Sequence, residues 1–173
     1  MILCSHAVVG AALASLMPSR PLTAFVVGFA SHFALDAIPH ADYPIRSRSV
    51  DPNVGAPMVL DKALLWDALA IGSDGLFGIM AAVFLFGSPV ALWAVLLGAI
   101  GAMLPDPLQF VYTRFPHEPL RTLQRFHRWA HTDRQIQGAI TAVSTQAALV
   151  FAVVWVAAAI DHGPFAAALA MAH

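Results

Sequence analysis

Long apolar runs, separated by short polar or proline-containing breaks, dominate the chain. Five of them stand out, at residues 2–17, 22–38, 63–86, 90–104 and 136–160. A helix needs about 20 apolar residues to span a bilayer, within a range of roughly 17–25. The pattern therefore predicts five transmembrane helices, of which the first and fourth are short enough to require local thinning of the bilayer.

Residues that begin or end helices support these boundaries. Pro18 and Pro21 separate the first two runs, and Asp61 is placed to cap the third. Pro105 is expected to stop the fourth helix. Small residues that permit close helix contact occur within the third and fourth runs, at Gly72, Gly75, Gly78, Gly98 and Gly101.

A sixth helix of a different kind is predicted at residues 119–133. Its basic side carries Arg121, Arg125 and Arg128, and its apolar side includes Leu123 and Phe126. Such a helix suits the headgroup layer of a membrane. The predicted fold is therefore an all-α, polytopic membrane helix bundle of about five transmembrane helices plus one interfacial amphipathic helix. Residues 1–173 are expected to form a single integral membrane domain.

Composition agrees with a membrane protein. Hydrophobic residues make up 59% of the chain and charged residues only 11%, whereas a soluble domain carries roughly 25% charged residues. Membrane lipids are therefore the expected surroundings, and other membrane-protein subunits are possible partners. The formal net charge of −1 argues against nucleic acid as a partner.

The positive charges are distributed unevenly between the two sides that five alternating spans would define. Of the nine lysines and arginines, only Arg20 falls on the second side. The other eight fall on the side of the N-terminus, at Arg46, Arg48, Lys62, Arg114, Arg121, Arg125, Arg128 and Arg134. The positive-inside rule makes that side cytoplasmic. The chain is thus predicted to lie in a bacterial inner membrane, with its N-terminus in the cytoplasm.

Histidines and aspartates that are remote in sequence fall in the same cytoplasmic layer of this topology. Ionisable groups in apolar helices are costly and usually mark a site. His32 and Asp36 are spaced i,i+4, as are His127 and His131, which places each pair on one helix face. The predicted metal ligands are His6, His32, Asp36, Asp106, His127 and His131. His40 falls near the same face as Asp36, but Pro39 is expected to end the helix before it.

Each of these residues also has a structural interpretation. His6 is compatible with a plain interfacial residue, and His32 with Asp36 is compatible with a buried hydrogen-bonded pair. His127 and His131 would also suit the exposed face of a surface helix. Asp106 follows Pro105 and suits a turn. The metal hypothesis rests on the convergence of these groups rather than on any single motif.

The same residues resemble the YdjM-like group of predicted membrane-bound metal-dependent hydrolases. The resemblance is carried by His6, the block Ser31–His40, the turn Leu104-Pro105-Asp106 and the pair His127-x-x-x-His131. Two departures stand out. The blocks occur in the reverse order of many members, and Pro107 follows Asp106 where members often carry a second aspartate. The His-x-x-x-Asp element is also similar to one in zinc-dependent phospholipase C.

The leading functional hypothesis is a metal-dependent hydrolase of a phosphate ester, or of a lipid-like substrate, at the cytoplasmic membrane face. The predicted ligands would bind one or two divalent ions. Imidazole ligands favour zinc, and the carboxylates would also suit manganese or iron. Asp36 or Asp74 would accept a proton, and Arg128, with Arg121 or Arg125, would stabilise charge on the phosphoryl oxygens.

A second hypothesis is non-enzymatic. The chain would then be an accessory subunit of a larger membrane protein complex that retains a metal-binding, hydrolase-like scaffold. The missing second carboxylate and the glycine- and alanine-rich helix faces favour this interpretation. A transporter is disfavoured, because transporter sites usually lie near the bilayer midplane rather than at one end.

Overall fold

The computed structural model describes residues 1–47 and 59–162, and this part of the chain is all-α, as predicted. Arg48, one of the cytoplasmic charges counted above, lies outside the described residues. The described part contains seven helices, namely α1 (Leu3–Ser15), α2 (Pro21–Asp36), α3 (Lys62–Phe86), α4 (Leu92–Met103), α5 (Pro105–Arg114), α6 (Leu120–Ala130) and α7 (Ala139–His162).

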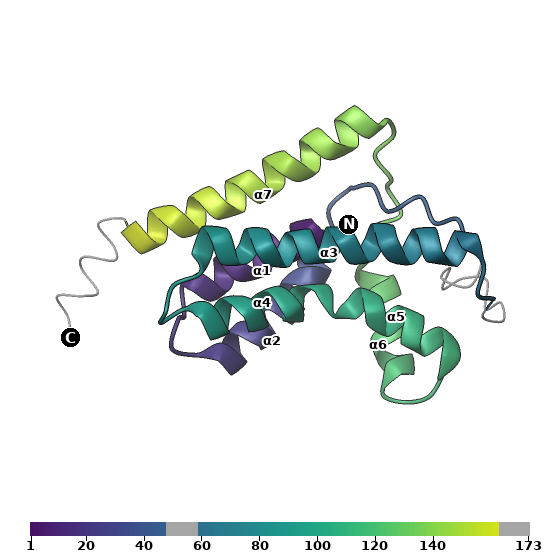
Figure 1. Cartoon of the computed structure of the whole chain (residues 1–173), viewed down its shortest axis with the longest axis horizontal. Helices are drawn as coiled ribbons and strands as arrows, with labels where there is room; N and C mark the ends of the chain where they lie inside the picture. Colours follow the sequence, from purple (N-terminus) through teal and green to yellow (C-terminus); the bar gives the residue numbers. More distant parts are fainter. Residues whose placement is uncertain (48–58, 163–173) are drawn as a thin grey trace.

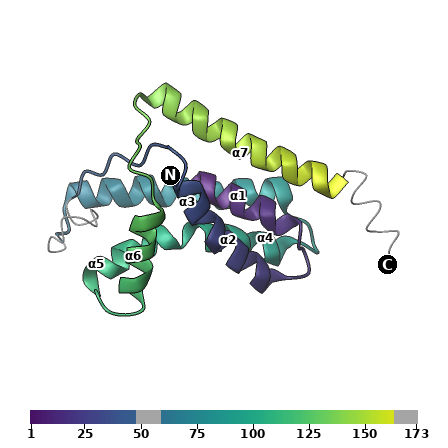
Figure 2. The same ribbon diagram turned by 180° about the vertical axis from the view of Figure 1, so that it is seen from behind.

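Helices α1, α2 and α4 pack against one another, and α3 packs on α1 and α4 (Figure 1). The pair α5 and α6 lies to the right of this bundle in Figure 1 and contacts it through α5 on α4 and α6 on α2. Helix α7 packs on α1 and crosses the molecule at an angle, as the view from behind also shows (Figure 2). The bundle therefore occupies one end of the molecule, and the α5–α6 pair occupies the other.

The bundle is held closely together by small residues where α1, α2 and α4 meet. A β-carbon added at Gly98 would lie 2.6 Å from the β-carbon of Ala14 and 2.7 Å from the carbonyl oxygen of Gly10. One added at Gly28 would lie 2.1 Å from the carbonyl oxygen of Gly98. The backbones thus approach to a distance that only glycine permits. The close contact predicted for Gly98 is confirmed, whereas Gly72 faces open space.

The prediction of five spans was wrong in number. Within the described residues, only α3, with 25 residues, and the segment Ala139–Ile160 of α7, with 22, are long and apolar enough to cross a membrane individually. The pair α4 and α5 adds a third candidate if it is taken as one span bent by 46°. The first and second runs form helices of 13 and 16 residues. These helices are shorter than the roughly 17 residues that a span requires.

The fourth helix ends before Pro105, as predicted, since α4 stops at Met103; the helix that follows was not predicted. The chain bends and continues as α5, with Pro105 in its first turn. Proline is tolerated there because the amide hydrogen it lacks has no intrahelical acceptor. The predicted amphipathic helix is present as α6. It ends at Ala130, so that His131 has an extended backbone with ψ of 133°.

The start of α1 lies beside the middle of α3. The side chain of Asp74, near the centre of α3, accepts hydrogen bonds from the backbone nitrogen of Cys4, at 2.8 Å, and from the hydroxyl of Tyr43. Asp61 caps α3, as predicted, by accepting a hydrogen bond from the backbone nitrogen of Leu64. The short helices α1 and α2 therefore reach only part of the way along α3, and the polar side chains gather where they stop.

Candidate metal centre

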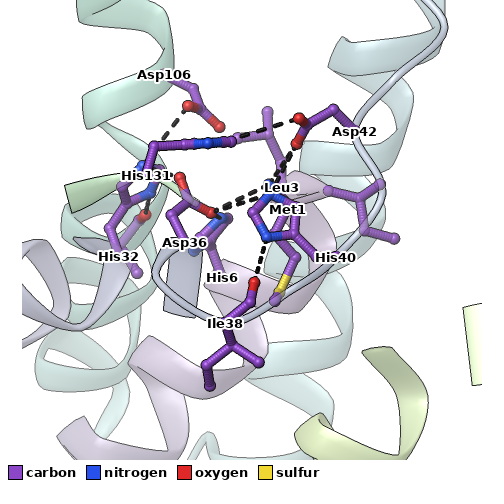
Figure 3. Close-up of polar contacts among 12 residues, drawn as sticks. Met1, Leu3, His6, His32, Asp36, Ile38, His40, Asp42, Asp106 and His131 are labelled. Atoms are coloured by element: carbon purple, nitrogen blue, oxygen red, sulfur yellow. Dashed lines mark hydrogen bonds and ion pairs between the residues drawn. The ribbon is translucent and has the colours of Figure 1, made fainter. Parts of the chain in front are cut away.

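Asp36, the last residue of α2, lies at the centre of the polar cluster and is buried (Figure 3). Its Oδ2 atom lies 3.1 Å from Nε2 of His32 and 3.2 Å from Nε2 of His127. Its Oδ1 atom lies 3.2 Å from Nε2 of His6 and 3.8 Å from Nε2 of His40. The two oxygens of one carboxylate therefore face different sets of imidazoles.

Four side chains around Oδ2 form what we term the first ligand group: His32, Asp36, Asp106 and His127. One nitrogen or oxygen atom from each lies within 4.8 Å of all the others. Asp106, in the first turn of α5, brings Oδ1 to 3.6 Å from Nε2 of His32 and 3.9 Å from Nε2 of His127. Donors about 2 Å from a shared ion lie at separations of this order. The group thus has the composition and spacing of a mixed nitrogen and oxygen metal site.

Three side chains form a second ligand group: Asp36, His40 and His131. Two backbone hydrogen bonds hold the segment after α6 against the segment after α2. The nitrogen of Thr132 donates to the carbonyl of Asp36 at 2.9 Å, and that of Ile136 donates to the carbonyl of His40 at 3.0 Å. This pairing brings the rings of His40 and His131 to a centroid distance of 4.9 Å.

Backbone carbonyls fix the orientation of three of the histidine rings. The Nδ1 atoms of His32, His40 and His131 lie 2.8, 2.7 and 2.9 Å from the carbonyl oxygens of Ala102, Ile38 and Thr132, respectively. A carbonyl only accepts, so the proton of each neutral ring resides on Nδ1 and the lone pair on Nε2. In each case Nε2 then points at carboxylate oxygens. Metal-binding histidines usually have this arrangement, with the other ring nitrogen donating outside the site.

Two further imidazoles test whether the cluster fits a cation. His127 is buried and its Nδ1 has no hydrogen-bond partner, and Nδ1 of His6 likewise lacks one. His6 stacks on His32 with ring centroids 4.1 Å apart, but it belongs to neither ligand group. Buried polar atoms without partners are rare and costly. Where a lone pair on Nε2 faces a carboxylate oxygen, a divalent cation between the two atoms satisfies both. The residues present therefore fit a divalent cation.

Asp42 lies at the more exposed edge of the second group. Its Oδ1 is 2.9 Å from Nε2 of His40, and its Oδ2 is 3.7 Å from Nε2 of His131. Burial favours the neutral acid, but the interactions with His131 and His40 hold the pKa of Asp42 below its usual range. The interaction with Asp42 raises the pKa of His131, against the smaller effect of burial. At this edge of the cluster, the charged forms of Asp42 and His131 are therefore favoured.

The structure brings all six predicted ligands to one cluster. His131 is the C-cap residue of α6, its ring centroid lies 6.0 Å from that of His127, and the two residues join different ligand groups. Asp74 instead binds Cys4 and Tyr43, and Arg128 is exposed on α6. The roles predicted for Asp74 and Arg128 in catalysis stay predictions.

Several residues of the cluster were missed by sequence reasoning. His40 is buried despite lying beyond the end of α2, and Asp42 follows it by two residues. Gln109 donates to Oδ1 of Asp106 at 3.2 Å, and Gln124 donates to Oε1 of Gln109 at 3.1 Å. The i,i+3 spacing of Asp106 and Gln109 is a signal that was available in the sequence.

Comparison of the chain with known protein families, with curated proteins and with solved structures finds no match. The likeness to the YdjM-like group therefore rests on the motif residues alone. The metal centre rests on the side-chain geometry around Asp36.

Proposed function

We propose that the protein is a metal-dependent hydrolase of a phosphate ester carried by a lipid or a lipid-like molecule. The observation that carries the proposal is the first ligand group, in which His32, Asp36, Asp106 and His127 present donors within 4.8 Å of one another. These four side chains come from α2, the start of α5 and the end of α6. Helix packing and not local sequence therefore creates the set.

The donor set favours zinc, since imidazole and carboxylate together suit this ion, and manganese or iron would also be accepted. When bound, a divalent ion of this kind supplies a Lewis acid that polarises phosphoryl oxygens and lowers the pKa of water. Asp36 would act chiefly as a ligand, because both of its oxygens already face imidazoles. Asp106, with 26% of its side chain exposed, marks the open side of the first group.

Arg128 would bind the phosphate group of the substrate. It lies one residue beyond His127 on the exposed side of α6, and Arg125 is exposed on the same helix. An arginine presents parallel N–H donors that match phosphate oxygens. The two arginines would thus orient the substrate and stabilise charge on the phosphoryl oxygens beside the ligand group.

The position of the cluster favours a membrane-embedded substrate. The start of α1, which carries His6, lies beside the middle of α3, the longest candidate span. On α6, Phe126 and Trp129 are exposed next to the arginines. A helix that exposes both basic and aromatic side chains lies in the headgroup layer. A phosphate ester that enters from the bilayer would meet the arginines and the ligand group together.

The cytoplasmic face of a bacterial inner membrane remains the proposed location. The α5–α6 region, which borders the cluster, carries four arginines, at positions 114, 121, 125 and 128. Basic segments next to spans usually stay in the cytoplasm. Tagging of the N-terminus, followed by protease accessibility in sealed vesicles, tests this orientation.

The test measures metal and hydrolysis together. The protein is purified in mild detergent, its bound metal is measured by mass spectrometry, and cleavage of bis-(p-nitrophenyl) phosphate and of phosphatidylglycerol in mixed micelles is followed. We expect bound metal in the wild type, and in His127→Ala a reduced metal content together with the loss of hydrolysis. Arg128→Gln should keep the metal and lose most of the hydrolysis. The exposed His117 provides the control variant His117→Ala. Wild-type protein without metal, even after incubation with Zn²⁺, would contradict the proposal.

One observation favours the accessory-subunit function instead. His32, Asp36 and His127 are almost fully buried, with exposed fractions of 0, 1 and 2%. Structural metal sites are closed, whereas catalytic sites keep an open position. In that case the bound metal would stabilise the fold and no hydrolysis would be detected. Native gels in mild detergent would show a stable larger complex, which His32→Ala would disrupt.

A further inference from the structure

The carboxylate of Asp36 faces two separate groups of donors. Its Oδ2 serves the first ligand group, within 3.2 Å of His32 and His127, whereas Oδ1 lies on the side of His40. One carboxylate can bind a different ion through each of its oxygens. In two-ion hydrolytic sites the ions lie about 3.5–4 Å apart. The central position of Asp36 is thus suited to a bridge.

The two histidines on the Oδ1 side, His40 and His131, are oriented as metal ligands. The Nδ1 atoms of His40 and His131 lie within 2.9 Å of backbone carbonyls, so each neutral ring presents a lone pair at Nε2. Nε2 of His40 lies 3.8 Å from Oδ1 of Asp36, and one ligand atom from each of Asp36, His40 and His131 lies within 4.8 Å of the others. This side chain set therefore has three converging donors without any contribution from His32, Asp106 or His127.

A fourth donor borders the same space. The carboxylate of Asp42 lies 2.9 Å from Nε2 of His40 and 3.7 Å from Nε2 of His131. Gln135 holds its Oδ2 by a hydrogen bond of 2.7 Å. The amino nitrogen of Met1 lies between the two carboxylates, at 3.1 Å from Asp36 and 2.8 Å from Asp42. A positive charge is therefore favoured at this position.

We propose that Asp36, His40 and His131, assisted by Asp42, bind a second divalent cation, which Asp36 bridges to the cation of the first ligand group. The proposal rests on the proposed function only in assuming that the first group binds metal. The second group is the more accessible, with 26% of His131 and 38% of Asp42 exposed. The second ion therefore binds more weakly and exchanges faster than the first.

Manganese titration of chelator-treated protein in detergent tests the proposal, because Mn²⁺ can be counted by mass spectrometry and its coupling is visible by electron paramagnetic resonance. The wild type should bind two equivalents, with a spin-coupled signal from a bridged pair. His40→Ala and His127→Ala should each bind one equivalent with an uncoupled signal, and His117→Ala should behave as the wild type. His131→Gln, at a partly exposed position, replaces His40→Ala if the latter fails to fold.

The outcomes separate the two proposals. A wild type that binds one equivalent, which is lost in His127→Ala and kept in His40→Ala, overturns the second site and leaves the first. In that case the Met1 ammonium alone balances Asp36 and Asp42. Two equivalents without spin coupling overturn the bridge. Wild-type protein that binds no Mn²⁺ and no Zn²⁺ overturns both the second site and the proposed function.

Discussion

His32 and Asp36 lie one turn apart on α2, and Nε2 of His32 is 3.1 Å from Oδ2 of Asp36. Neither side chain reaches the surface of the molecule. The carbonyl of Ala102 on α4 accepts from the opposite side of the His32 ring. The pair is therefore a local product of helical spacing, but its orientation toward the other donors is set by a neighbouring helix.

Replacement of Asp36 by asparagine should remove all tightly bound metal. The substitution keeps the shape of the side chain but removes the charge that faces both ligand groups. Mass spectrometry of the purified variant should find less than a tenth of the wild-type metal. Asp133→Asn, at an exposed position, is the matched control. Wild-type metal content in Asp36→Asn would refute a central role for this carboxylate.

Removal of metal should lower the thermal stability of the protein. A ligand that binds only the folded state contributes about 4 kcal/mol at a free concentration 1,000 times its Kd. Melting curves in detergent should therefore shift down after treatment with a chelator and recover on addition of Zn²⁺. Asp36→Asn, which removes a ligand of both groups, should melt at the same temperature with and without the chelator. An unchanged wild-type melting temperature would favour a network of hydrogen bonds without metal.

Gln109 should act as a positioning residue for Asp106. It donates to Oδ1 of Asp106 and accepts from Gln124, which is buried. Loss of a hydrogen bond that orients a ligand typically costs 10–100-fold in metal affinity. Gln109→Leu should therefore weaken Zn²⁺ binding by this factor, as measured by competition with a chromogenic chelator.

The control for this effect is Gln124→Leu, which leaves Gln109 in contact with Asp106 and should weaken binding less. Equal affinity in Gln109→Leu and the wild type would show that Asp106 needs no such support.

Asp74 should contribute to stability rather than to catalysis. Its carboxylate pairs with the backbone nitrogen of Cys4 and the hydroxyl of Tyr43. Asp74→Ala leaves both donors unpaired and should lower the free energy of unfolding by about 1–3 kcal/mol. Metal content should not change. Tyr43→Phe removes one of the two donors to Asp74 and also the acceptor of the Leu3 amide, so it should destabilise the protein as well.

Asp74→Asn distinguishes the two roles, because it keeps an acceptor oxygen but loses the basicity of the carboxylate. A large loss of hydrolysis in this variant, with an unchanged melting temperature, would support the catalytic role predicted from the sequence.

Gly98→Ala should destabilise the bundle. The added β-carbon would lie 2.6 Å from that of Ala14 and 2.7 Å from the carbonyl oxygen of Gly10. Overpacking of this kind typically costs about 1–3 kcal/mol. Gly72→Ala is the matched control, since nothing lies within 4 Å of the added carbon and alanine favours the helix. Similar melting temperatures for the two variants would contradict the close crossing of α1, α2 and α4.

The sequence predicted where helices begin and end better than it predicted which helices cross the membrane. Apolar periodicity placed α3 within one residue of its observed start and at its observed end. The same signal could not show that α1 and α2 are only 13 and 16 residues long, because apolar side chains continue past the helix ends. Pro105 marked the end of α4 correctly, but it did not reveal that the chain bends by 46° and begins a new helix there. Local residue preferences do not show whether the helical path ends at a break or bends there and continues as a new helix.

The sequence predicted contacts between donors that lie on the same helix. It could not predict contacts between donors on different segments of the chain. Spacing alone paired His32 with Asp36. Spacing also paired His127 with His131, whose ring centroids lie 6.0 Å apart, but it could not show that the two residues join different ligand groups. Asp42 gave no periodic signal, since it belongs to an extended segment held against the residues after α6 by backbone hydrogen bonds.

The sequence by itself determined an all-α, apolar chain with a small set of imidazoles and carboxylates that could not be buried without a purpose. Those properties follow from residue type and from the helical repeat, which act over a few positions. Only the tertiary structure decided that Asp36 stands between two donor groups. That arrangement depends on how far α1 and α2 extend along α3 and on where α5 and α6 turn back. Such distances are set by packing between segments far apart in the chain.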